Sequence, residues 1–83
     1  MPYIKPEDRN RLSTYFDGPE PASAGELNYC LTRVIQNYMF DKKHSYQNYN
    51  EVIGVLECCK LELYRRMIAP YEDEAIKRSG DVY

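Results

Sequence analysis

The sequence predicts an all-α protein, namely an antiparallel helical hairpin with short N- and C-terminal helices, assembled as a homo-oligomer. Three observations lead to this fold class. Apolar residues recur at steps of three and four, the repeat of one face of a helix. No segment alternates apolar and polar residues as a half-buried strand does, so we expect no strands. Proline and glycine divide the chain into segments of helix length.

The chain is expected to form one domain over residues 1–83 and to open with a short helix over residues 6–16. Pro6 suits the first helical position, and the acidic residues after it complement the helix dipole. Residues 17–22 contain two prolines and a glycine and read as an extended linker.

Two long helices are expected next, at residues 24–41 and 48–69. Ser23 and Glu26 form a capping box at the start of the first. Asn48 with Glu51 is predicted to cap the second in the same way. The polar loop between them is short, which favours antiparallel neighbours.

The helix over residues 48–69 organises the rest of the chain. Its main apolar stripe consists of Tyr49, Val52, Ile53, Leu56, Cys59, Leu63 and Met67. Further small and apolar residues lie away from that stripe, namely Gly54, Val55, Cys58, Leu61 and Ile68. A surface helix normally carries a single apolar stripe, so we expect this helix to lie between two layers. In a chain this short, the second layer is expected to be another subunit.

Pro70 is predicted to break this helix, because proline disfavours helical geometry in the residue before it. The break would form a concave corner. A last short helix is expected over residues 70–79, with acidic residues in its first turn and Gly80 as its C-cap.

Composition limits the function. The chain has 11 basic and 13 acidic residues and a net charge of −2, which argues against a broad surface for polymeric DNA or RNA. No run approaches the roughly 20 apolar residues of a membrane span, and the polar N-terminus is no signal peptide. Three cysteines, two of them adjacent, make no disulfide framework. We therefore expect a cytoplasmic protein without membrane contact.

The sequence indicates no reaction. Its only histidine, His44, lies in a polar loop, and the cysteines lack the spacing of metal ligands. We predict no catalytic residue, no metal and no cofactor, and hence a protein that is not an enzyme. A small hydrolase built across a subunit interface is the alternative.

Two groupings of tyrosine and arginine are candidate ligand sites. Tyr64, Arg65 and Arg66 come just before the expected corner, with Tyr71 just after it. Tyr29 and Arg33 lie one turn apart on the first long helix. A ring beside a guanidinium can stack a base and bind a phosphate. The alternatives are a solvated or interfacial helix face, or arginines that interact with the last carbonyls of a helix.

Several sequence blocks resemble a family of small proteins found in tailed phages, prophages and environmental bacterial sequences. They include MPYIKPEDR at the N-terminus, LELYRR before Pro70, APYEDE around it and GDVY at the C-terminus. The resemblance spans nearly the whole chain and implies a phage-associated origin. Small phage proteins of this kind include oligomeric sponges that sequester host immune nucleotides, such as cyclic oligonucleotides and cyclic ADP-ribose derivatives. The resemblance assigns no role to any residue.

These observations predict a non-catalytic binding protein, namely a phage sponge for a host immune nucleotide that acts in the host cytoplasm. Arg65 and Arg66 are the expected phosphate contacts, with Tyr64 or Tyr71 as the stacking surface. Tyr29 and Arg33 are the alternative pair. The alternative function is a phage accessory module for protein interaction, or an inhibitor of a host protein, because the nine tyrosines suit an interface.

Overall fold

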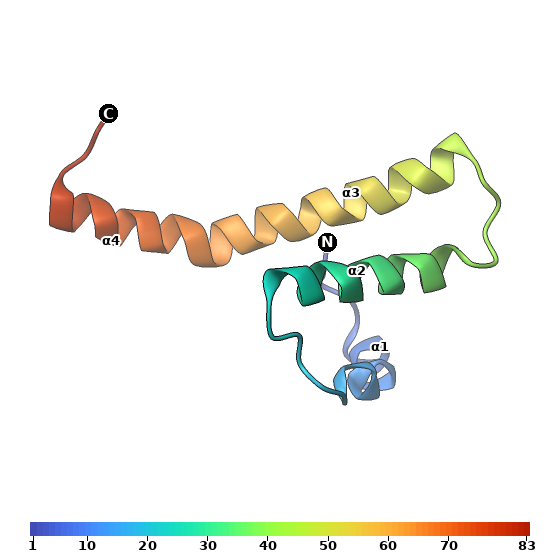
Figure 1. Ribbon diagram of the computed structural model, residues 1–83. Helices are drawn as coiled ribbons and strands as arrows, with labels where there is room; N and C mark the ends of the chain where they lie inside the picture. Colours follow the sequence, from blue (N-terminus) through green and yellow to red (C-terminus); the bar gives the residue numbers. More distant parts are fainter. The chain divides into compact units, whose positions relative to one another are not determined.

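The computed structural model describes residues 1–83 and is all-helical, without a strand, which confirms the all-α part of the predicted fold class (Figure 1). Its elements are α1 (Pro6–Arg11), the 3₁₀-helix η1 (Ser13–Phe16), α2 (Ala24–Met39), α3 (Tyr46–Leu63), the π-helical turn η2 (Tyr64–Ile68) and α4 (Ala69–Ser79). None of the helices is both long enough and apolar enough to cross a lipid bilayer.

The chain divides into two compact units, each described here by itself. One comprises Tyr3–Val52, and the other comprises Ile53–Tyr83 together with Met1–Pro2. The boundary falls inside α3. The single domain and the helical hairpin therefore stay predictions.

The first predicted helix is shorter than expected. Pro6 lies at its start and acidic residues fill its first turn, as predicted, but α1 ends at Arg11. The Leu12 N–H still donates to the Asp8 carbonyl four residues back, whereas the Tyr15 N–H donates to Leu12, three residues back. The chain thus tightens into η1 before the linker over residues 17–22, which has no regular structure, as predicted.

The capping box of α2 is confirmed. The Glu26 N–H donates to Ser23 Oγ at 3.1 Å, and Glu26 Oε1 accepts from the Ala22 N–H at 2.9 Å. These bonds satisfy two backbone donors that a bare helix start would leave without partners. The helix ends at Met39 rather than at the predicted residue 41.

The predicted cap of the central helix is wrong. α3 begins at Tyr46, and the N-cap is Ser45, whose Oγ accepts from the Asn48 N–H at 3.2 Å. The Asn48 side chain instead donates to the Lys43 carbonyl at 2.7 Å and closes the loop. Serine and asparagine are equally good caps, so two such residues three apart leave the start ambiguous.

The predicted corner at Pro70 is also wrong. Ala69 has helical angles, φ −59° and ψ −47°, and the helical conformation continues through η2 into α4. A proline ring clashes with the carbonyl four residues earlier in an α-helix, and a π turn shifts that carbonyl by inserting one residue. The end of α4 is as predicted: Gly80 has φ +87° and donates its N–H to the Ile76 carbonyl.

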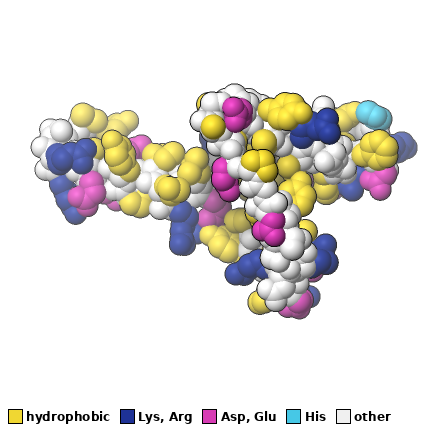
Figure 2. Space-filling model, turned by 60° about the horizontal axis from the view of Figure 1, so that its bottom comes forward, with side chains coloured by type: hydrophobic (Ala, Val, Ile, Leu, Met, Phe, Trp, Pro, Cys, Tyr) yellow, Lys and Arg dark blue, Asp and Glu magenta, His cyan; other side chains and the backbone are white.

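No residue of the chain is buried. Large apolar side chains are exposed on every helix except α1, and Figure 2 shows them over the visible surface. The residues closest to burial are half-buried and include Ile35, Val52, Cys58 and Ala69. Neither unit therefore completes a hydrophobic core of its own.

Candidate functional site

The Tyr64, Arg65 and Arg66 grouping lies on the π-helical turn η2. π turns inside α-helices are rare and occur frequently at functional sites. The sequence feature that marks this π turn is Pro70, which we interpreted from the sequence as a break in the helix. Because the helix continues, the expected concave corner is absent and these side chains extend from a convex helical surface.

Carboxylates surround this grouping. Arg65 forms an exposed ion pair with Glu62 at 3.3 Å, one turn earlier. The Tyr64 hydroxyl lies 3.5 Å from Glu72 Oε2, two turns later. A phosphate placed here would compete with Glu62 for Arg65 and would meet the negative charge of Glu72.

Arg66 and Tyr71 complete the grouping. The Arg66 guanidinium makes no hydrogen bond or ion pair within the chain, and the Tyr71 ring is 68% exposed. Both groups are therefore available to a partner outside the chain.

Tyr29 and Arg33 lie on one face of α2, one helical turn apart. The Tyr29 ring is 65% exposed, and the Arg33 guanidinium has no hydrogen bond or ion pair within the chain. The nearest acidic residue on α2, Glu26, is occupied in the capping box. The structure thus keeps a ring and a cation together here without a competing carboxylate. This grouping belongs to the unit Tyr3–Val52, whereas the η2 grouping belongs to the other unit, so each is a separate candidate.

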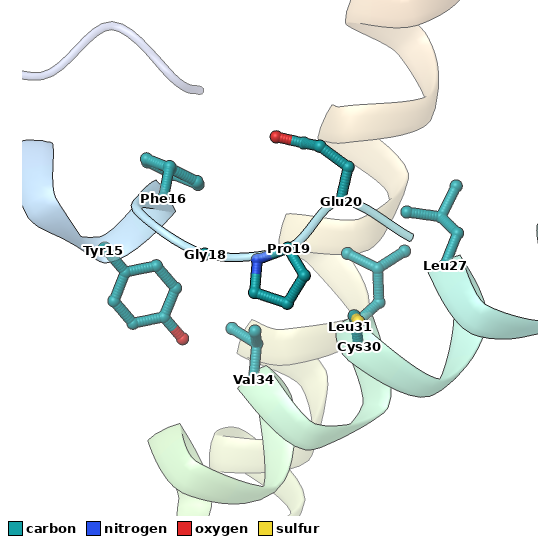
Figure 3. A pocket seen from close by; sticks show the side chains of 9 residues that line it. All are labelled: Tyr15, Phe16, Gly18, Pro19, Glu20, Leu27, Cys30, Leu31 and Val34. Atoms are coloured by element: carbon teal, nitrogen blue, oxygen red, sulfur yellow. The ribbon is translucent and has the colours of Figure 1, made fainter. Parts of the chain in front are cut away.

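Sequence reasoning missed an apolar hollow on the opposite face of α2. Its volume is about 310 Å³, and η1 and the linker form one wall (Figure 3). Its lining residues are Tyr15, Phe16, Gly18, Pro19, Glu20, Leu27, Cys30, Leu31 and Val34. In Figure 3 the Pro19 ring lies between the Tyr15 ring and the aliphatic side chains of α2. The sequence feature that could have predicted this hollow is a proline-rich linker followed by an apolar helix face.

The loop between α2 and α3 is held by its own side chains. His44 Nδ1 and the Tyr49 hydroxyl are in hydrogen-bond contact, and the Lys42 ammonium lies 4.1 Å from the centre of the Tyr38 ring. The only histidine is therefore engaged in the loop structure. No three His, Cys, Asp or Glu side chains are placed to hold a metal ion, and all three cysteines are free.

Comparison with known proteins assigns the chain to a family. No curated protein and no solved structure matches it. A family model described as a domain of unknown function (DUF6899) matches residues 1–82, which is almost the entire chain. The protein is therefore a member of the DUF6899 family.

Proposed function

We propose that the protein is a non-catalytic binding protein that works as a homo-oligomer and sequesters a small phosphate-bearing nucleotide. The observation that carries the proposal is the pair on α2, where the Arg33 guanidinium has no partner in the chain and the exposed Tyr29 ring lies one turn away. A planar ring for a base and a fork of donors for a phosphate are the two contacts that a nucleotide needs.

The surroundings favour Tyr29 and Arg33 over the grouping on η2. Glu62 already neutralises Arg65, and Glu72 lies against the Tyr64 hydroxyl. A phosphate gains most from a cation that is not already paired. Arg66 is the one unpaired cation of the η2 grouping, and it is the competing phosphate contact.

Assembly supplies the rest of the site. A single helix face is convex, whereas small-molecule sites are concave and enclose most of their ligand. The absence of any buried residue supports two levels of packing, an antiparallel hairpin of α2 with α3 and contacts between identical chains. A second chain lying beside α2 would provide the missing wall.

The resemblance to phage proteins supports the specific form of the proposal. A phage-encoded sponge would bind a cyclic nucleotide or a cyclic ADP-ribose derivative in the host cytoplasm without converting it. The net charge of −2 supports a single small ligand rather than polymeric DNA or RNA.

The apolar hollow supports a second candidate function, a module that binds a host protein. Exposed aromatic and aliphatic walls are typical anchor pockets of protein interfaces. On this alternative, Tyr15 and Phe16 would contact the partner, and nucleotides would have no effect on the protein.

Thermal-shift screening against cyclic dinucleotides, cyclic oligonucleotides and ADP-ribose derivatives tests the proposal, because a ligand raises stability by mass action. Calorimetry with the strongest hit would then compare Arg33→Ala with Arg65→Ala and Arg66→Ala. We expect Arg33→Ala to lose roughly tenfold to a hundredfold in affinity and the other two to change little. Loss in Arg66→Ala alone would move the site to η2, and a screen without any hit would overturn the nucleotide proposal.

A further inference from the structure

The Tyr29 and Arg33 pair belongs to a longer row of side chains along α2. The row consists of Tyr29, Arg33, Gln36 and Phe40, and we call it the α2 row. With 3.6 residues per turn, these four positions lie within about 60° of one another around the helix axis. Phe40 comes directly after α2 and keeps helical angles, φ −53° and ψ −45°, so it belongs to the same face.

The α2 row has an aromatic ring at each end and two polar groups between them. With a rise of about 1.5 Å per residue, Arg33 lies about 6 Å, Gln36 about 10 Å and Phe40 about 16 Å along the axis from Tyr29. The two polar groups therefore lie on either side of the middle of the row. The Arg33 guanidinium and the Gln36 amide make no hydrogen bond within the chain, so both can bind an external group.

The two rings do not belong to the packing face of α2. Its half-exposed aliphatic residues Leu27, Leu31 and Val34 line the apolar hollow and point about 140–200° away from Tyr29. Phe40 is 91% exposed. One exposed ring needs no explanation, but two rings in register on the side opposite the packing face are free to stack planar groups.

The charge of the α2 row is positive. Arg33 is its only charged residue, and the single acidic residue of α2, Glu26, accepts hydrogen bonds in the capping box. The neighbours that flank the row, Thr32 and Asn37, are uncharged. The row therefore suits a ligand that is anionic in the middle and planar at both ends.

This pattern distinguishes between the ligands of the proposed function. A single base with its sugar and phosphate is too short to reach both rings. A cyclic dinucleotide in an extended conformation has a base at each end and two phosphates between them. The order ring, guanidinium, amide, ring matches the order base, phosphate, phosphate, base. Cyclic ADP-ribose has two phosphates but only one base.

We propose that the α2 row binds a nucleotide with two bases, of the cyclic dinucleotide class. One base stacks on Tyr29 and the other on Phe40, and the phosphates accept hydrogen bonds from Arg33 and Gln36. The proposal rests on the proposed function and narrows its ligand to the class with two bases.

Three ligands with the same base test the proposal by calorimetry. They are cyclic di-AMP, cyclic AMP, which has one base and one phosphate, and cyclic ADP-ribose, which has one base and two phosphates. Stacking on an aromatic ring tolerates any base, so adenine is a suitable probe. We expect cyclic di-AMP to bind at least fivefold more tightly than either of the other two, because only it stacks on both rings.

Matched variants locate the second base. Phe40→Ala should lower the affinity for cyclic di-AMP by roughly fivefold to a hundredfold and leave that for cyclic AMP unchanged. Tyr46→Ala is the control, since Tyr46 is an aromatic residue of the same unit, is 84% exposed and lies outside the row. Gln36→Ala should lower the affinity for cyclic di-AMP by roughly tenfold, through the loss of one phosphate contact. Circular dichroism checks that each variant stays helical.

Three outcomes would overturn the proposal. If cyclic AMP or cyclic ADP-ribose binds as tightly as cyclic di-AMP, the site takes one base, and the proposed function stands. If Phe40→Ala has no effect, or has the same effect as Tyr46→Ala, the second base does not stack on the row. If none of the three ligands binds, the narrowed class fails, whereas the proposed function is judged by the wider nucleotide screen.

Discussion

The Ala69 N–H donates its hydrogen bond to the carbonyl oxygen of Tyr64, five residues earlier. An α-helix would pair it with Arg65, four residues earlier. The wider turn lies directly before Pro70, whose nitrogen carries no hydrogen and whose ring would collide with the carbonyl of an α-helical turn. The proline thus changes the register of the helix without ending it.

Pro70→Ala should therefore raise the stability of the helix. The alanine restores an N–H, and we expect a gain of about 1–2 kcal/mol, below the ~3 kcal/mol of proline in a regular helix, because the π turn has already relieved the clash. Thermal unfolding measures the gain, with Pro2→Ala as a control outside the helices. A lower melting temperature would contradict this account.

Gly54→Ala should stabilise α3. No atom lies within 4 Å of the position that a Cβ would take there, and glycine inside a helix costs about 0.5–1 kcal/mol relative to alanine. Denaturant unfolding measures the gain. Gly80→Ala is the contrasting variant: its φ of +87° suits only glycine, so the same substitution should cost about 1 kcal/mol there. A loss of stability in Gly54→Ala would show that another chain packs closely at this position.

Ser45→Ala should lower stability by about 1 kcal/mol, because Ser45 Oγ is the acceptor for the Asn48 N–H at the start of α3. Ser13→Ala is the control, since the Ser13 hydroxyl only donates to the Asn10 carbonyl in an exposed turn. Equal effects of the two substitutions, measured by urea unfolding, would argue against Ser45 as the cap.

The three thiols should differ in their rate of reaction with a disulfide reagent. Cys30 and Cys59 are exposed, whereas Cys58 is half-buried, and access is one of the terms that sets thiol reactivity. We expect two fast thiols and one slower thiol, assigned by single Cys→Ser variants. If Cys30 reacts more slowly than the other two thiols, the hollow on α2 is already filled, by a partner or by another segment.

Local rules predicted the parts of this fold that depend on few neighbouring residues. The Ser23 and Glu26 capping box and the Gly80 C-cap were predictable because each is decided within one helical turn. The start of α3 was not, because Ser45 and Asn48 are both good caps and only the Asn48 bond to Lys43 separates them. Pro70 was misread for a similar reason, since a π turn and a helix break begin from the same clash.

The candidate sites show where sequence patterns stop being informative. Spacing alone placed Tyr29 and Arg33 one turn apart, as α2 has them. Spacing did not reveal that Glu62 pairs with Arg65 or that Tyr64 reaches Glu72, because those contacts depend on side-chain conformations. The apolar hollow was missed because it needs η1 and the linker to lie against α2.

The absence of a buried residue has a consequence for the turnover of the protein in a cell. Proteases cut chains that open locally, and a helix whose side chains are solvated on all sides opens at little cost in free energy. A newly made chain would then be degraded quickly until it meets its partner, and bound chains would persist. If that partner is a second copy of the chain, as the proposed homo-oligomer requires, the protein would persist only where its own concentration is high enough for assembly.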